Sequence, residues 1–247
     1  MPLRIPLDAL VHFPPLPPDA ALADKLARSR VLLDAVLHRL DPARVAVAYT
    51  GGKDSGIALW LWNEALARGG RRGLRAISVD TGLKFPQVTA FRDQVCAELG
   101  AELALARPAV DLSGYPVAQD KLSCCRDLKI EPLGRAIRET GTLALITGLR
   151  RDEHPSRAGR PYAEFRPATE HCPEHWQVNV ILDWSEMDVW AHVTGECLPY
   201  CELYHEGYRS LGCMPCTRKG GEGEDERAGR DQDKERQLEA LKALGYF

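Results

Sequence analysis

The chain has 247 residues, of which 45% are hydrophobic, enough to bury one large core. Its formal net charge of −3 gives no overall basic field, so nucleic acid is not expected as a partner. Prolines interrupt the N-terminus where an export signal would be apolar, and no stretch approaches the ~18 apolar residues of a membrane-spanning helix. We expect a soluble, cytoplasmic protein with no membrane partner. A homo-oligomer is compatible with the sequence.

Helical and strand patterns alternate along most of the chain. After a Pro-rich entry, residues 19–40 have the apolar spacing of an amphipathic helix, and residues 43–50 form a short apolar run typical of a buried parallel strand. The alternation continues with helices expected near 56–70, 88–100 and 130–141, and strands near 74–82, 101–110 and 142–148. This pattern predicts an α/β fold with an open, Rossmann-like parallel sheet and helices on both faces.

The later segments are less regular. Residues 155–176 are polar and Pro-rich, which predicts a mobile loop, whereas 176–193 favour a strand and then a helix capped by Ser185. The charged stretch 220–234 is expected to be solvated and followed by a short helix. We therefore expect an N-terminal segment (1–42), a nucleotide-binding α/β domain (43–219) and a charged tail (220–247).

A Gly-rich loop follows the first predicted strand. Its residues are Thr50, Gly51, Gly52, Lys53, Asp54 and Ser55. Backbone N–H groups at such a helix start can face an anion, with Lys53 neutralising a phosphate and Ser55 donating a hydrogen bond. Asp54 could hold Mg²⁺ or anchor the loop. The pattern differs from the Walker loop, and a turn without a ligand remains an alternative.

Four of the eight cysteines stand in two pairs. Cys124 and Cys125 are adjacent, and Cys213 and Cys216 form a CxxC pair. Two such pairs can converge on one soft metal centre. Zinc accepts four thiolates too, but adjacent cysteines suit a tetrahedral zinc site poorly, so the spacing favours an iron–sulfur cluster. Chance burial of the cysteines remains the alternative.

The loop YTGGKDSG (49–56) resembles the SGGKDS loop of the ATP-pyrophosphatase superfamily, with Thr50 in place of the usual Ser. That resemblance implies an adenine nucleotide alpha-hydrolase-like fold and ATP as a ligand. The segment VDTGLKFPQVTAFRD (79–93) is similar to the one after the second strand in the small subunit of ATP sulfurylase and in sulfonucleotide reductases. By this resemblance Asp80, Thr81 and Gly82 lie near the adenosine.

Three further segments resemble the phosphoadenylyl-sulfate and adenylyl-sulfate reductase family: CCRDLKIEPL (124–133), ITGLRRDEHPSRAGR (146–160) and GYRSLGCMPCTR (207–218). In that family the corresponding four cysteines bind one [4Fe–4S] cluster. The resemblance places Lys129 beside the cluster and assigns Arg150 and Arg151 to a phosphate or sulfate, with Arg157 a weaker candidate. Leu128 stands where the family has a second cation.

The sequence also departs from this family. Reductases carry a nucleophilic cysteine in a C-terminal Glu-Cys-Gly-Leu-His segment, whereas this sequence has no cysteine after Cys216. Lys53 is kept, although assimilatory reductases often lose it, which points to ATP. Cys201 stands where related sequences commonly have Asn, and it is either a sulfur carrier or a small buried residue.

These features lead to one main hypothesis and two alternatives. The first is an ATP- or adenylyl-nucleotide-dependent sulfur-transfer enzyme with a [4Fe–4S] cluster, in which Lys53, Arg150, Arg151 and Cys201 are the candidate catalytic residues. The second is an adenylyl-sulfate reductase that uses another thiol. The third is a non-catalytic redox or nucleotide sensor. The sulfur donor and the acceptor are not identified by the sequence.

Overall fold

The computed structural model describes all residues except 1–6, 8–9, 11–12, 222 and 246–247. Its centre is a six-stranded sheet in the order β3-β2-β1-β4-β6-β5. The strands are β1 (Val45–Ala48), β2 (Arg75–Val79), β3 (Glu102–Ala106), β4 (Ala144–Thr147), β5 (Ala163–Arg166) and β6 (His175–Asn179). Neighbouring strands run parallel except for β5, which pairs with β6 in the antiparallel direction.

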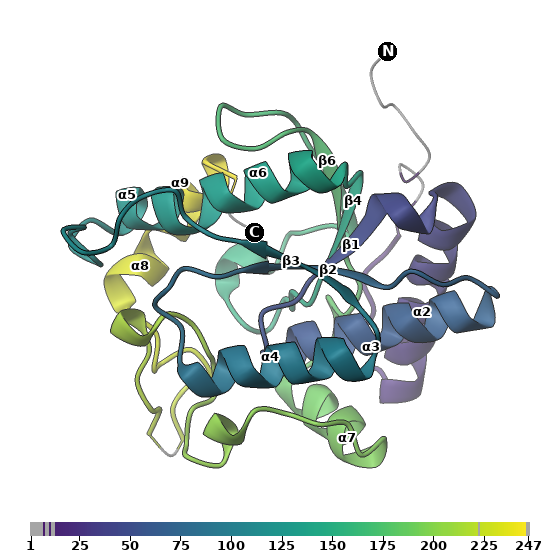
Figure 1. The fold of residues 1–247 in the computed structure, drawn as a ribbon. Helices are drawn as coiled ribbons and strands as arrows, with labels where there is room; N and C mark the ends of the chain where they lie inside the picture. Colours follow the sequence, from purple (N-terminus) through teal and green to yellow (C-terminus); the bar gives the residue numbers. More distant parts are fainter. Residues whose placement is uncertain (1–6, 8–9, 11–12, 222, 246–247) are drawn as a thin grey trace.

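Helices cover both faces of this sheet (Figure 1). One face carries α2 (Leu22–Arg39), α3 (Lys53–Arg68), α4 (Pro86–Glu98) and α7 (Glu186–Gly195). The other carries α5 (Lys121–Cys125), α6 (Glu131–Thr140) and α9 (Leu238–Ala243), and α8 (Gln232–Arg236) lies at the side near α5. The predicted Rossmann-like α/β fold is therefore confirmed.

The first strand shows why the sheet is sandwiched between helices. All four of its side chains are buried, and they alternate between two cores. Val45 and Val47 join the larger core beneath α2 and α3, whereas Ala46 and Ala48 join the smaller core beneath α6. A strand that is apolar on both faces is stable only with a layer on each side. Leu7 and Leu10, from the N-terminal segment, also pack into the larger core.

Short-range signals account for α7. Ser185 caps it with a reciprocal capping box, because its hydroxyl accepts from the Asp188 N–H while the Asp188 carboxylate accepts from the Ser185 N–H. The predicted cap is confirmed.

Two stretches differ from the sequence-based expectation. Residues 155–176, expected to be a loop, contain β5, because Ala163 is buried and the Phe165 ring packs edge-on against Trp176 at 5.5 Å. The tail, expected to be solvated, buries Arg227, Arg230 and Lys234. Burial of these cations is stable because the tail returns to acidic and polar partners near the carboxyl ends of the strands.

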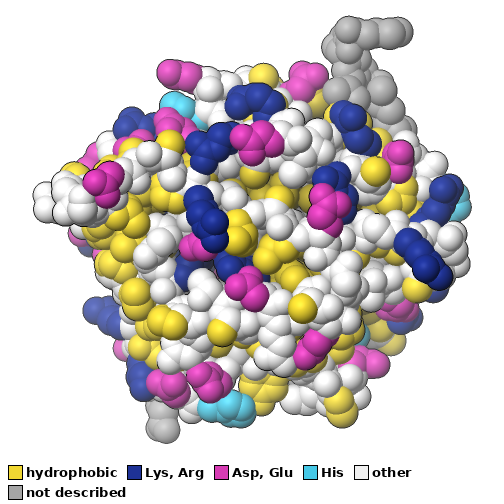
Figure 2. Space-filling view, viewed as in Figure 1, with side chains coloured by type: hydrophobic (Ala, Val, Ile, Leu, Met, Phe, Trp, Pro, Cys, Tyr) yellow, Lys and Arg dark blue, Asp and Glu magenta, His cyan; other side chains and the backbone are white. Residues whose placement is uncertain are grey.

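The surface in Figure 2 carries Lys and Arg interspersed with Asp and Glu, without a wide field of one sign. None of the helices in the described ranges is long and apolar enough to cross a membrane.

The chain direction around the sheet reverses between β1 and β4. After β1 the chain proceeds outward through β2 and β3, and it then returns to place β4 on the other side of β1. Loops leaving the carboxyl ends of two such strands diverge and leave a crevice, which is where open α/β sheets bind ligands. Beside the crevice, the residue after β4 packs closely against the first turn of α3. A Cβ atom on Gly148 would lie 2.5 Å from the Asp54 carbonyl carbon and oxygen.

We predict that Gly148→Ala lowers the free energy of unfolding by about 1–3 kcal/mol, because the added methyl group forces α3 away from β4. Chemical denaturation monitored by circular dichroism measures this loss. Gly159→Ala is the matched control, since a Cβ atom there meets nothing within 4 Å. Equal stability of the two variants would show that α3 does not depend on the close approach.

Candidate functional site

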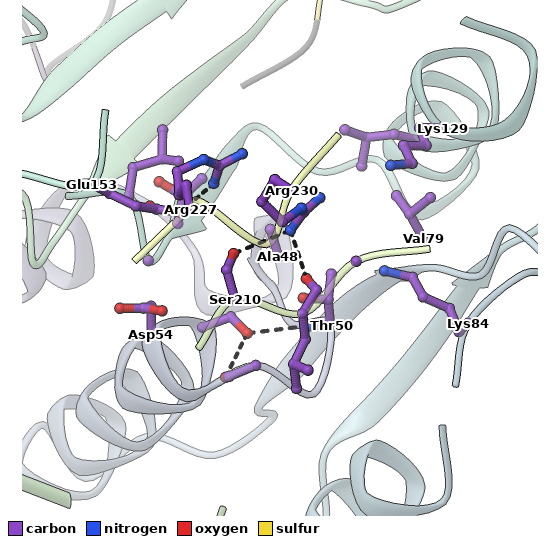
Figure 3. Close-up of a pocket in the computed structure, with 18 of the residues that line it drawn as sticks. Ala48, Thr50, Asp54, Val79, Lys84, Lys129, Glu153, Ser210, Arg227 and Arg230 are labelled. Carbon is purple, nitrogen blue, oxygen red and sulfur yellow. Dashed lines mark hydrogen bonds and ion pairs between the residues drawn. The ribbon is translucent and has the colours of Figure 1, made fainter. Parts of the chain in front are cut away.

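A cavity of about 170 Å³ opens at the carboxyl ends of β1 and β4, at the position where the sheet reverses (Figure 3). Its walls come from the Gly-rich loop, the ends of β2 and β4, the loop after β4, the π-helical turn η2 (Arg126–Ile130) and the tail. Its polar and charged lining residues are Thr50, Asp54, Ser55, Lys84, Lys129, Thr147, Glu153, Arg157, Tyr204, Ser210, Arg227 and Arg230. Segments distant in sequence therefore share one pocket.

The Gly-rich loop is held in a fixed shape at the start of α3. The Ser55 hydroxyl donates to the Gly52 carbonyl at 3.0 Å and accepts from the Thr50 N–H at 3.4 Å. Gly51 has φ +82°, and a Cβ atom there would lie 2.8 Å from the Val88 carbonyl oxygen, so this position requires glycine. The resulting loop presents the first turn of a 16-residue helix to the cavity.

Tyr204 closes this loop from another part of the chain. Its hydroxyl accepts from the Lys53 backbone N–H at 2.9 Å, and its ring lies 5.5 Å from the Lys53 ammonium. Because Gly52 supplies no side-chain cap to α3, the tyrosine satisfies one of the helix's first free N–H groups. Burial raises the pKa of Tyr204 well above its usual value, so the hydroxyl stays neutral.

Two buried cations meet behind the loop. Lys53 is 4% exposed and Arg150 is fully buried, and both contact the carboxylates of Asp54 and Glu226. Arg150 also pairs with Asp152 at 2.6 Å. Burial alone would lower the pKa of Lys53, but Asp54, Tyr204 and Glu226 outweigh this effect and raise it, so the ammonium remains charged.

A second ion-pair network fastens the tail over the loop after β4. Glu153 contacts both Arg157 and Arg227, and Arg227 makes a bidentate pair with Glu235 at 2.7 and 2.8 Å. Burial would raise the pKa of Glu153, but Arg157 and Arg227 overcome this and hold it well below its ordinary value. The carboxylate is therefore ionised throughout the physiological range.

The opposite end of the cavity is basic. Figure 3 shows Arg230 between two acidic residues, Asp54 and Glu153, on one side and two lysines, Lys84 and Lys129, on the other. Arg230 donates to the Ser210 hydroxyl at 3.2 Å and to the Leu211 carbonyl at 3.1 Å, while its buried Nε has no hydrogen-bond partner among the described residues. A Cβ atom on Gly212 would collide with this guanidinium, so the glycine makes room for it.

Three of the four cysteines predicted as ligands, Cys124, Cys213 and Cys216, interact electrostatically with Lys129 at this basic end. Cys124 and Cys125 end α5, directly before η2, and a hydrogen-bonding contact of 3.3 Å joins Cys213 to Thr81. Burial would raise the pKa of Cys213, but Lys129, Lys84 and Thr81 lower it to about 6. Burial raises the pKa of Cys124 and of Cys216, and the nearby Cys213 thiol raises both further.

The donor set suits a soft metal centre, because it offers four thiols and Lys129 acts electrostatically on Cys124, Cys213 and Cys216. Even so, no three His, Cys, Asp or Glu side chains within the described ranges are already arranged as a metal site. The π-helical turn widens the helix immediately after the adjacent cysteines and places Lys129 at the cavity. Such turns are frequent at functional sites.

Other predicted site residues lie outside the cavity wall. Arg151 pairs with Asp183 and donates to the Arg160 carbonyl at 2.8 Å, although it is adjacent to Arg150. Cys201 is 1% exposed within an apolar cluster, and burial raises its pKa. Neither side chain therefore lines the cavity.

The predicted segment after β2 packs against Cys213, near the basic end of the cavity. Thr81 is fully buried against Cys213, and Asp80 accepts from the Gly82 N–H at 3.2 Å. Asp80 also faces Arg92 and Arg107 at 3.7 and 3.8 Å. None of the three predicted residues lines the cavity, whereas Val79 and Lys84 on either side of them do.

Sequence reasoning missed Tyr204, Glu226, Arg227 and Arg230. The last three lie in a Gly- and charge-rich stretch, which is a composition typical of a solvated tail. One signal was present, because two arginines three residues apart flank small residues that allow close packing. A Cβ atom on Gly229, for example, would lie 2.3 Å from the Arg218 carbonyl oxygen.

Residues 44–219 match the family model described as "Phosphoadenosine phosphosulfate reductase domain". An adenosine 5'-phosphosulfate reductase of Neisseria meningitidis serogroup A is 44% identical over 116 residues, which are 47% of this chain and 45% of that protein. The chain thus spans about half the length of that relative. The enzyme of the same name from Burkholderia cepacia is 32% identical over 221 residues, 85% of each chain.

A solved structure has the same fold. The phosphoadenylyl-sulfate reductase of Candida auris, in its phosphate complex, superimposes with a TM-score of 0.63 at 19% identity, over 80% of this chain and 96% of that one. The match to the family model covers more than half of the sequence. This chain therefore belongs to the phosphoadenosine phosphosulfate reductase domain family.

Proposed function

We propose that the protein is an enzyme of sulfur metabolism that binds ATP and uses it to transfer sulfur to an acceptor. One observation carries the proposal: a single cavity has a phosphate-type loop at one end, with two buried cations behind that loop, and a basic region near the cysteine pairs at the other end. ATP adenylates an acceptor oxygen, pyrophosphate leaves, and a sulfur species displaces AMP.

The loop end would bind the phosphates. Thr50 and Ser55 line the cavity beside the first turn of α3, and Lys53 and Arg150 supply positive charge behind them. Fixed cations at this place stabilise charge that develops on the leaving pyrophosphate. Asp54 lines the same wall, and a Mg²⁺ ion bound there would shield it from the phosphates.

The basic end would bind the second reactant. Lys84, Lys129 and Arg230 suit a sulfate, a sulfur anion or an α-phosphate, because guanidinium and ammonium groups donate strong charge-assisted hydrogen bonds. The unpartnered Nε of Arg230 is a donor without an acceptor in the described part of the chain. We infer that Arg157, which also lines the cavity, adds positive electrostatic potential between its two ends.

Cys124, Cys125, Cys213 and Cys216 would hold a [4Fe–4S] cluster in this proposal. The cluster would supply a redox-active or sulfur-binding centre, and Lys129 would offset its negative charge. All eight cysteines are free thiols, which agrees with the reducing cytoplasm proposed as the location.

Reduction of adenylyl sulfate is the second candidate, favoured by the names of the Neisseria and Burkholderia relatives. That reaction requires a thiol that reaches the sulfur atom. None of the cavity-lining residues in the described ranges is a cysteine, and Cys201 is buried elsewhere. The retained Lys53 suits a triphosphate better than an adenylyl sulfate, which has no β- or γ-phosphate.

Product analysis distinguishes the two candidates. Anaerobically purified protein is incubated with ATP, a sulfide source and candidate acceptors, or with adenylyl sulfate and thioredoxin. We expect AMP and pyrophosphate from ATP, and no sulfite above background from adenylyl sulfate. Sulfite release that is lost in Cys201→Ser would contradict sulfur transfer and support the reductase.

Lys53→Ala is expected to weaken ATP binding by about 1.5–3 kcal/mol while changing AMP binding little, since in this proposal its charge would pair with the terminal phosphates. Isothermal titration calorimetry with both nucleotides measures the difference. Lys219→Ala is the control, because this lysine is exposed, pairs with Glu206 and does not line the cavity. Equal losses for ATP and AMP would mean that Lys53 only supports the loop.

We predict that protein prepared without oxygen contains about four irons per chain, and that Cys124→Ser or Cys213→Ser loses them. Cys96→Ser should keep them, because Cys96 is buried in the larger core, away from the cavity. Iron analysis and the visible absorption spectrum report the outcome. Stoichiometric zinc in iron-replete, oxygen-free preparations would overturn the assignment.

A further inference from the structure

Both cations at the loop are buried and already paired with carboxylates. The Lys53 ammonium faces Asp54 at 3.2 Å, the Arg209 carbonyl at 3.1 Å and Glu226, which together match its three donors. The three nitrogens of the Arg150 guanidinium each face a carboxylate, from Asp54, Asp152 and Glu226. Neither cation lines the cavity. A phosphate can therefore reach them only after one partner leaves.

Glu226 is the partner that differs from the others. Asp54 is adjacent to Lys53, and Asp152 lies two residues after Arg150, whereas Glu226 comes from the tail, 173 residues after Lys53 and 76 after Arg150. One Glu226 oxygen contacts Lys53 and the other contacts Arg150, so its carboxylate bridges the two cations. Two oxygens of one phosphoryl group could make the same pair of contacts.

We propose that Glu226 is an internal substitute for the terminal phosphates of the nucleotide, and that a polyphosphate ligand displaces it from Lys53 and Arg150. This inference rests on the proposed function, because it assigns a ligand class to the same site. AMP, which lacks the terminal phosphates, binds without displacing Glu226. The carboxylate thereby selects for ligands that bring more negative charge than it removes.

The surrounding charges make this exchange feasible. Three carboxylates face two cations here, so the loss of one still leaves Asp54 in contact with both. Burial and the nearby Asp54 raise the pKa of Glu226, although Lys53 and Arg150 oppose the shift. The site therefore does not stabilise the ionised carboxylate relative to water.

The backbone beside Glu226 is anchored independently of its carboxylate. Arg227 pairs with Glu235, and the Arg218 N–H donates to the Gly229 carbonyl at 2.8 Å. Displacement of the Glu226 carboxylate therefore does not require release of the tail.

The test compares the full-length protein with Glu226→Gln and Glu226→Asp, with Asp225→Asn as the control. Asp225 is an exposed acidic neighbour, so its variant removes the same charge beside the site. Calorimetric titration uses pyrophosphate, ATP and AMP at constant ionic strength. Because a competing internal group reduces apparent affinity by the fraction of open sites, Glu226→Gln should bind pyrophosphate and ATP roughly tenfold tighter or more.

AMP affinity should stay unchanged in Glu226→Gln, and Asp225→Asn should match the wild type for all three ligands. Glu226→Asp keeps the charge but withdraws the carboxylate by one methylene, so its affinity gain should be intermediate. Without ligand, Glu226→Gln should melt at a lower temperature than the wild type, and pyrophosphate should raise its melting temperature by more. Glu226→Asp and this thermal comparison serve if Glu226→Gln is too unstable for titration.

Unchanged or weaker binding of pyrophosphate and ATP by both Glu226 variants, with a wild type that binds ATP, would overturn the displacement and leave the proposed function standing. An equal gain for AMP would contradict the assignment of Glu226 to the terminal phosphates. Failure of the wild type and of every variant to bind either polyphosphate would remove both this inference and the proposed function.

Discussion

The arrangement of this protein depends on the burial of two positive charges at the start of α3. Lys53 and Arg150 lie almost wholly out of solvent, and an unpaired charge in such a place costs several kcal/mol. Neutralising them requires carboxylates, of which Asp54 is local and Glu226 comes from the other end of the chain. This requirement brings the tail to the switch point of the sheet and joins it to the loop after β4.

The same tail connects the two ends of the cavity. Glu226 contacts the cations of the phosphate-type loop, whereas Arg230 lies beside the basic end that the cysteines flank. The next residue, Asp231, donates its N–H to the Cys216 carbonyl and pairs with Lys121 at the start of α5. Residues 226–231 of the tail therefore contact both the buried cations and the segments that carry the cysteine pairs.

Local patterns in the sequence were sufficient for much of the fold. The strand β1 alternates between two cores, and the cap at Ser185 uses groups three residues apart, so each feature is determined by its immediate neighbours. The Gly-rich loop also follows from its own residues. The edge strand β5 was not predictable in this way, because it depends on a contact between Phe165 and Trp176.

The candidate site was predictable only in part, because its chemistry depends on contacts between distant segments. Arg150 and Arg151 are equivalent in the sequence, yet packing after β4 turns the first toward Asp54 and the second toward Asp183. Tyr204 and Glu226 contact Lys53 from 151 and 173 residues away. No local pattern encodes such pairs, and a charged composition alone favours a solvated tail.

We propose that Lys53 and Arg150 form one anion site, which Glu226 occupies until a polyphosphate replaces it. A crystal structure of the protein with ATP or pyrophosphate bound would show which group occupies this site. We expect phosphate oxygens in contact with both cations, and the Glu226 carboxylate turned away from them. Phosphates bound elsewhere, with Glu226 still bridging Lys53 and Arg150, would contradict the proposal.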